Sequence, residues 1–424
     1  MRSPIKKLLA SIGQAKADHA VRHRTTGFEF AIADRIDLLH PDHWDAVTQD
    51  ATFFLSRDYL RLFENSGPSE ISPRYCLIAE RGQPLGVVAA QMVVLEGEQL
   101  VGQQRSQPTA SEKRNIRAMS KRLLGNIGHS TLSHVRRRVL VCGNLLSWGA
   151  HGFAMRANEE PARLWPAIAE ALYRIRNAEK LVGKTDYVMV KDLPSNLAID
   201  AKSLAQFSYR SVATDPDMVL EIPATWQSYD DYLQSLNAKY RKTAKALDTD
   251  LLKAGLRVEP LLDLSSEAES LHALYGQVQA KAKVRLASVP ATYLPALAEL
   301  AGPDRFRCSV VRRDGELLGF VTTLKDGDTA IGYYIGFDYE TNATAPVYLR
   351  LLQAVVADSI SLGCRRVSLG RTALEPKARL GAKPMPMTVW MRHRLPLLNL
   401  VVRPLLSAIP HDEPPERSVF KESS

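Results

Sequence analysis

Polar side chains that could move protons or stabilise a negatively charged oxygen gather between residues 332 and 384. Tyr334 lies in the run TAIGYYIGFD, with Gly332 and Gly336 two residues away on either side. In a β-strand these three residues share one face, and two glycines leave that face open to a ligand. The Tyr334 phenol could then donate a proton to a leaving group or hold an acceptor. Packing of the ring in the core is the alternative.

Arg371, Glu375 and Lys377 follow in the stretch GRTALEPKARLGAKP. A lysine ammonium can stabilise negative charge that develops on an oxygen, and Glu375 is the nearest carboxylate that could accept a proton. The alternative for each side chain is an ordinary surface charge. The sequence has no Gly-x-Ser-x-Gly motif, so a hydrolase with a serine triad is not indicated.

A hairpin, a strand, a helix and a further strand must position these side chains. Strands are predicted over residues 306–313, 317–324, 329–338 and 365–371, with Asp-Gly turn signals at 314–315 and 326–327. Residues 346–362 predict a helix, with Pro346 in its first turn and Gly363 just past its end. Tyr348 lies in that first turn, where free amides attract anionic groups, and is a further candidate for substrate contact.

The order of these elements resembles the core of the GNAT acyltransferase fold. Residues 370–384 and the stretch YDDYLQSLNAKYRKTAKALDTDLLKAG at 229–255 resemble the Fem-type aminoacyl transferases and the related FemAB-like acyltransferases of peptidoglycan biosynthesis or recognition. The resemblance implies an α/β (α+β) fold of two tandem GNAT-like domains. Each domain would be a mixed, mostly antiparallel sheet flanked by helices.

The same resemblance implies transfer of an acyl or aminoacyl group to an amine or hydroxyl of a cell-envelope precursor or a related metabolite. It places Arg371 and Lys377 near the donor or acceptor, and it makes Tyr240 and Arg241 contacts of the acceptor. Such a transfer needs a positioned nucleophile, a proton acceptor and a stabilised oxyanion. The alternative is a non-catalytic module that recognises an envelope glycan or lipid.

One departure from the GNAT pattern leaves the donor open. The usual coenzyme A loop, Q/R-x-x-G-x-G/A, would fall in YETNATAPVY at residues 339–348, which contains no glycine. Glycines let backbone amides approach a pyrophosphate, so acetyl-CoA is disfavoured. Acyl-CoA in another pose, aminoacyl-tRNA and acyl carrier protein remain as donors. No permanently bound cofactor is expected, and no metal, because the four cysteines form no ligand motif.

The elements of the second half recur in the first half. Gly82 aligns with Gly315 at an offset of 233 residues, whereas Gly183 aligns with Gly363 at an offset of 180, so the first copy carries an insertion of roughly 50 residues. Strands near 139–146 and 218–222 should close the first domain. We predict a basic arm (1–26), a first GNAT-like domain (27–224) with an insertion at about 105–138, a linking helix (225–255), a second GNAT-like domain (256–410) and a disordered tail (411–424).

The net charge of +9 is concentrated in that insertion. Residues 105–138 contain nine basic residues and a single acid, Glu112, and residues 112–127 predict an amphipathic helix with a basic face. Such a segment could meet an anionic membrane surface or tRNA, or it could be only a solvated face. DNA is not an expected partner.

Targeting signals are not apparent in the sequence. The first 20 residues lack a continuous apolar run, and no run reaches the roughly 18 apolar residues of a membrane span. Four cysteines without a pairing pattern are typical of a reducing compartment. We therefore expect a cytoplasmic protein, either free or at the inner face of the membrane.

Overall fold

The computed structural model describes residues 24–95, 136–156, 159–282, 287–395, 398–399, 415 and 417–421. We call the two halves of the molecule the first and the second unit. The strands of the first unit are β1 (Glu29–Ala33), β2 (Ile71–Glu80), β3 (Gln83–Leu95), β4 (Arg137–Cys142), β5 (Phe153–Met155) and β6 (Tyr187–Pro194). Those of the second unit are β8 (Arg257–Pro260), β9 (Phe306–Arg313), β10 (Glu316–Asp326), β11 (Thr329–Phe337) and β12 (Arg366–Ser368). Two long strands, β7 (Arg210–Glu221) and β13 (Lys383–His393), join the units.

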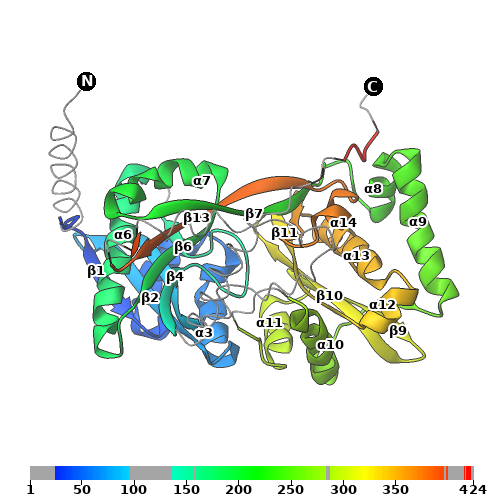
Figure 1. Cartoon of the computed structure of the whole chain (residues 1–424), viewed down its shortest axis with the longest axis horizontal. Helices are drawn as coiled ribbons and strands as arrows, with labels where there is room; N and C mark the ends of the chain where they lie inside the picture. The colour runs from blue at the N-terminus through cyan, green and yellow to red at the C-terminus, as the bar shows by residue number, and fades with distance from the viewer. Residues whose placement is uncertain are drawn as a thin grey trace, which may run out of the picture.

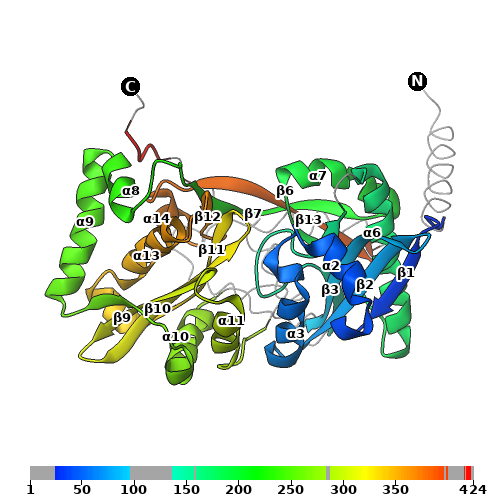
Figure 2. The same ribbon diagram turned by 180° about the vertical axis from the view of Figure 1, so that it is seen from behind.

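One sheet of 13 strands runs through the described residues. Its order is β1-β2-β3-β4-β6-β13-β7-β12-β11-β10-β9-β8, and β5 pairs with β3 outside this path. Figures 1 and 2 show the two units side by side, with β7 and β13 crossing between them.

Helices cover the sheet in both units. Those of the first unit are η1 (Ile36–Leu38), α2 (Pro41–Thr48), η2 (Phe53–Leu55), α3 (Arg57–Ser66), α6 (Pro161–Ala178), η4 (Glu179–Leu181), α7 (Ser195–Asp200) and η5 (Ala201–Phe207). Those that follow are α8 (Tyr229–Ser235), α9 (Ala238–Lys253), η6 (Ser265–Glu267), α10 (Ala268–Ala280), α11 (Tyr293–Ala301), α12 (Tyr339–Thr344), α13 (Val347–Ser361) and α14 (Leu374–Ala378).

The two units repeat one order of elements. In each, antiparallel strands lead to a helix that crosses over to a parallel strand: β4, α6 and β6 in the first unit, and β11, α13 and β12 in the second. The equivalent hairpins turn on two residues with positive φ, Arg81 (52°) and Gly82 (76°) in one, Asp314 (49°) and Gly315 (87°) in the other. Two-residue turns of this kind match the twist of the flanking strands.

The last strand of each unit lies in the sheet of the other. β7 follows the first unit in the chain but pairs antiparallel with β12, and β13 follows the second unit but pairs antiparallel with β6. The two strands also pair with each other. The expectation that residues 218–222 close the first domain is therefore wrong: they complete the second unit, and β13 completes the first.

A continuous apolar core crosses from one unit to the other. It includes a chain of buried phenols in which the hydroxyl of Tyr293 lies 3.1 Å from that of Tyr59 and 2.9 Å from that of Tyr333. Asn144 donates from Nδ2 to the Tyr59 hydroxyl over 2.7 Å. Because these residues come from both halves of the sequence, the units share one packed interface rather than two separate surfaces.

Two further expectations are corrected by the structure. The linking helix predicted at 225–255 is two helices, α8 and α9, separated by Leu236 and Asn237, and the Asn237 side chain caps α9 by accepting from Tyr240 N. Of the tail expected to be disordered, two described residues pack on the rest of the molecule: Phe420 forms a β-bridge with Leu236, and Val419 is 1% exposed.

The predicted basic insertion lies mostly outside the described residues, and so does its predicted helix at 112–127. The described residues resume at Arg136. The next two residues, Arg137 and Arg138, belong to β4. Among the helices that the structure describes, none combines the length and the apolar character needed to cross a bilayer.

Candidate functional site

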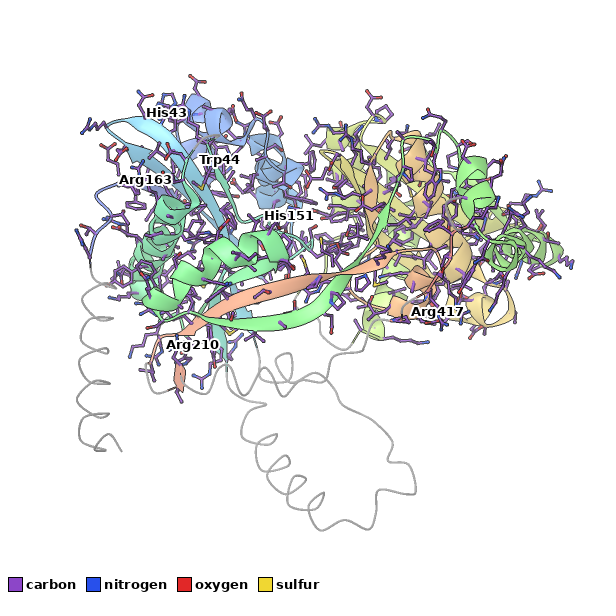
Figure 3. The ribbon with its side chains drawn as sticks, turned by 90° about the horizontal axis from the view of Figure 1, so that it is seen from above. His43, Trp44, His151, Arg163, Arg210 and Arg417 are labelled. Atoms are coloured by element: carbon purple, nitrogen blue, oxygen red, sulfur yellow. The ribbon has the colours of Figure 1, made fainter. Side chains whose placement is uncertain are left out.

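A cleft of about 1320 Å³ lies between the two units. Residues of both units and of the two crossing strands line it, among them Thr52, Trp148, His151, Asp217 and Asp326. Figure 3 shows His151 on the side of the first unit that faces the second. A cleft between two units is a common place for a substrate site.

Asp217 is the centre of a buried polar network on the wall of this cleft. Its carboxylate is 3% exposed and accepts from Ser368 Oγ (2.6 Å) and Gly370 N (3.0 Å). Ser368 Oγ in turn accepts from Trp148 Nε1 over 2.5 Å. Burial raises the pKa of Asp217, although the bond from Ser368 opposes this. A carboxylate with a raised pKa is a better proton acceptor than an exposed one.

Lys377 lies on α14 and is almost completely buried, at 4% exposure. The Asp217 carboxylate is close enough to act on the charge of Lys377. Among the described residues, however, Lys377 Nζ forms no hydrogen bond and no ion pair. Burial lowers the pKa of Lys377 to about 8, although the Asp217 carboxylate opposes this. An ammonium that is desolvated and not committed to another group can meet negative charge on a substrate.

Arg371 lies nearby but is committed to other groups. Its Nη1 donates to Asp192 Oδ1 over 2.6 Å and its Nε donates to the carbonyl of Asp215 over 3.0 Å. Burial alone would raise the pKa of Asp192, but Lys191 and Arg371 together hold that pKa below its ordinary value. Asp192 belongs to β6 of the first unit, and Arg371 follows β12 of the second. This ion pair therefore holds the two units together beside the cleft.

A second polar chain crosses the cleft from unit to unit. Thr52 Oγ1 donates to Asp326 Oδ2 over 2.6 Å and lies 2.8 Å from His151 Nδ1, while His151 Nε2 lies 2.8 Å from the carbonyl of Trp148. Phe53 N also donates to Asp326. Burial lowers the pKa of His151, and the Asp326 carboxylate opposes this. These contacts fix the imidazole at the edge of the cleft.

Tyr334 does not face an open cavity. Tyr333 and Tyr334 both lie opposite Thr322, because the pairing of β10 with β11 shifts there, and Tyr334 N donates to Thr322 Oγ1 over 2.9 Å. This bulge breaks the alternation that placed both glycines on the Tyr334 face: Gly332 lies against Val355 and Gly336 against α10. Tyr334 packs against Tyr275 and Tyr293, and burial raises its pKa well above the ordinary value.

None of the candidate residues named from the sequence lines the cleft itself, Lys377 and Arg371 included. Glu375 and Tyr240 line a separate hollow of about 270 Å³ between α9, α13 and α14. Glu375 pairs there with Arg379 and Arg417, and its bond from Arg379 is the main cause of its lowered pKa. Such a carboxylate is a weak base. Arg241 Nη1 lies near the carbonyls of Gln234 and Leu236.

The start of α13 is not open to an anion. The loop without glycine forms the short helix α12, whose Asn342 accepts from Tyr348 N over 2.9 Å. The Tyr348 ring is packed near Phe337, and burial raises its pKa to about 12. In the first unit, α6 begins with Pro161 and follows Glu159 and Glu160. Neither helix therefore presents the free amides that bind a pyrophosphate.

The sequence-based search for site residues missed Asp217, Trp148 and His151. Asp217 lies inside β7 and directly precedes the run MVLEI, and an acid beside such a run was an available signal. Trp148 and His151 lie in a glycine-rich loop after β4, where the backbone can turn sharply. Among the described residues, no group of His, Cys, Asp and Glu side chains could hold a metal ion.

Comparison with known proteins supports the fold. Residues 238–378 match the model of the acetyltransferase (GNAT) domain. The structure is similar to FemX (TM-score 0.50, 9% identity, 88% of this chain and 99% of that chain), to a tandem GNAT protein from the clavulanic acid biosynthesis pathway (0.48, 12%, 87% and 99%) and to L-PGS from Bacillus licheniformis (0.44, 11%, 82% and 96%). No curated protein sequence matches the chain.

The predicted fold class is confirmed: the molecule is an α/β protein with two GNAT-like units in tandem. At 9% identity, the likeness to FemX concerns the fold alone. The match to the acetyltransferase (GNAT) domain lies within residues 238–378, and it supports the predicted acyltransferase.

Proposed function

We propose that this protein transfers an acyl or aminoacyl group to an amine or hydroxyl of a cell-envelope precursor, and that the transfer takes place in the cleft between the units. The observation that carries the proposal is Lys377, a buried lysine without a hydrogen-bond or ion-pair partner in the described residues, beside a carboxylate that lines the cleft. A buried, uncommitted charge is costly to keep, and such groups are concentrated at functional sites.

Each group near this position has a role in the proposal. The Lys377 ammonium stabilises the oxyanion that forms when the nucleophile attacks the acyl carbon. Asp217 takes the proton that the nucleophile loses, because its raised pKa makes it a better base, and then gives it to the oxygen or sulfur of the donor as the acyl bond to that atom breaks. Ser368 and Trp148 hold the Asp217 carboxylate in place through their hydrogen bonds. Arg371 is a positioning residue, since its guanidinium ties the two units together.

The backbone at the start of α13 bears on which donor the protein uses. With Tyr348 N capped by Asn342, a donor that depends on pyrophosphate contacts at this helix is disfavoured. We therefore place aminoacyl-tRNA ahead of acyl-CoA as the donor. The acceptor is proposed to be a peptidoglycan precursor, either soluble or linked to a lipid.

The test compares transfer from aminoacyl-tRNA and from acetyl-CoA to peptidoglycan precursors, for the wild type and two variants. Lys377→Ala should lower turnover at least about a hundredfold, since loss of one oxyanion-stabilising group has that effect. Lys325→Ala is the control, because Lys325 is a half-buried lysine whose Nζ donates to the carbonyl of Leu362 and to no other group among the described residues. Equal losses in the two variants would show that Lys377 has no special role. Absence of transfer with every donor would favour a recognition module.

A further inference from the structure

Five strand ends meet at one edge of the first unit. Leu95 ends β3 beside Arg137, where β4 begins. Tyr187 begins β6 beside His393, close to the end of β13. Arg210, which Figure 3 labels at this end of the two long strands, begins β7. We call the surface formed by residues 136–138, 179–187, 392–395 and 398 the basic edge.

The basic edge carries an excess of positive charge. Within its residues, seven side chains are basic and two are acidic. The two acids, Glu179 and Asp186, are buried and already paired: Glu179 with Arg74 and Arg138, and Asp186 with Arg394 and others. Glu70, which directly precedes β2, adds one exposed acid. The outward-facing charge of this surface is therefore positive.

Exposed aliphatic side chains lie among these charges. Leu181, the last residue of η4, is 98% exposed, and Val182, which follows it, is 76% exposed. Lys180 and Lys184 flank them, and among the described residues neither lysine forms an ion pair. Leu395 and Leu398 add further exposed apolar surface on the same edge, at 43% and 44%. Folding requires no such exposure, and apolar groups rimmed by polar ones mark interaction sites.

Two stretches of the chain that lie mostly outside the described residues begin at this edge. The chain leaves the described residues after Leu95 and returns at Arg136, and both positions lie at the basic edge. Residues 96–135 contain six basic residues and three acidic ones, a net charge of +3. The apolar sequence LPLLNLVV, which starts at Leu395, also begins here. Basic and apolar stretches of the chain thus attach at the edge that is already basic and apolar.

We propose that the basic edge is a docking surface for an anionic lipid bilayer. Leu181 and Val182 would enter the boundary between headgroups and acyl chains, while Lys180 and Lys184 meet the lipid phosphates. RNA would use the charges but would gain nothing from the aliphatic pair. The aromatic rings of the edge, Tyr187 and His393, pack on each other with centroids 4.7 Å apart and do not form a platform for bases.

This docking surface is independent of the proposed catalytic residues. It rests on the proposed function only in this respect: it would hold the protein at the bilayer, where a lipid-linked acceptor lies. A failure of vesicle binding would leave transfer to a soluble acceptor untouched, and a failure of transfer would leave vesicle binding untouched.

The experiment is flotation of the full chain with vesicles of phosphatidylcholine alone or with about one third phosphatidylglycerol. The wild type should bind the anionic vesicles and not the neutral ones. Lys180→Gln with Lys184→Gln should weaken binding about thirtyfold, since each basic residue near the surface contributes roughly a factor of five. Leu181→Ser with Val182→Ser should weaken it as well, because apolar contact is lost.

Matched controls come from the second unit. Leu262→Ser replaces a leucine that is 92% exposed, and Lys253→Gln replaces a lysine whose side chain is 74% exposed. Both should bind vesicles as the wild type does. The proposal is overturned if the wild type ignores anionic vesicles, if it binds neutral ones equally well, or if the controls lose as much as the edge variants. A tRNA gel shift in which the lysine pair matters while vesicles do not bind would also overturn it, in favour of nucleic acid.

Discussion

Replacement of Lys377 by methionine should stabilise the protein at neutral pH, contrary to the usual effect of changing a buried residue. Burial lowers the pKa of Lys377 from 10.5 to about 8. At about 1.4 kcal/mol per pKa unit, keeping this lysine charged in the folded protein costs about 3 kcal/mol. Lys377→Met keeps the length of the side chain and removes the charge. The variant leaves Asp217 without its cation, which offsets part of the gain, so we expect a net gain of about 1–3 kcal/mol at pH 7.

The pH dependence supplies a sharper test of this reasoning. The folded-state pKa is lower than the unfolded one, so between about pH 8 and pH 10.5 the unfolded chain binds more protons at Lys377. The wild type therefore recovers stability as the pH rises through this window, and the variant has nothing to recover. Its advantage should be complete below about pH 8 and should vanish near pH 10.5.

The assay is urea unfolding of both proteins at several pH values from 7 to 10.5, with Lys325→Met as the control. Lys325 donates to the carbonyl of Leu362 over 2.6 Å, so its loss should destabilise the fold at pH 7. A Lys377→Met variant that is less stable than the wild type at pH 7 would refute the reasoning. So would an advantage that stays constant across the pH range, since packing and not charge would then explain it.

Two further predictions concern contacts away from Lys377. Asp326→Asn removes the carboxylate that raises the pKa of His151 against the effect of burial, so an NMR titration should find that pKa lower in the variant than in the wild type. An unchanged His151 pKa would mean that the chain through Thr52 carries no electrostatic coupling. Phe420→Ala should cost about 1–2 kcal/mol in urea unfolding, because the ring is partly buried and packs near Trp226 and Gly381. If the wild type and Phe420→Ala unfold at the same urea concentration, the Phe420 ring does not contribute to the packing of the fold.

Elements set by local signals could be predicted from the sequence. β9 spans the predicted residues, and α13 begins after Pro346 and ends before Gly363, which has a φ of 67°. Turn pairs such as Asp314-Gly315 and the spacing of apolar residues act over a few positions, so neighbouring residues contain the information. The resemblance in the second half added the fold class.

Features that depend on distant parts of the chain could not be predicted in this way. The pairing of β7 with β12 joins residues about 150 positions apart. The spacing of apolar residues along one strand does not indicate which distant strand it will pair with. The bulge at Tyr333 and Tyr334 depends on Thr322 in the facing strand, so alternation along β11 alone misplaced Tyr334. Lys377 was found from its motif, whereas its neighbour Asp217 comes from a strand that the sequence had assigned to the other unit.

The exchange of β7 and β13 has a consequence for how the chain is made. β13 begins roughly 190 residues after the end of β6, the strand it must cover. At roughly 5–20 residues per second, a ribosome needs about 10–40 s to produce that stretch. During this interval β6 has an open ladder of backbone donors and acceptors on one side. Any β13 that reaches this open edge first can fill it, including one from a neighbouring nascent chain. Crowded translation of this protein should therefore produce swapped dimers in which each copy completes the first unit of the other.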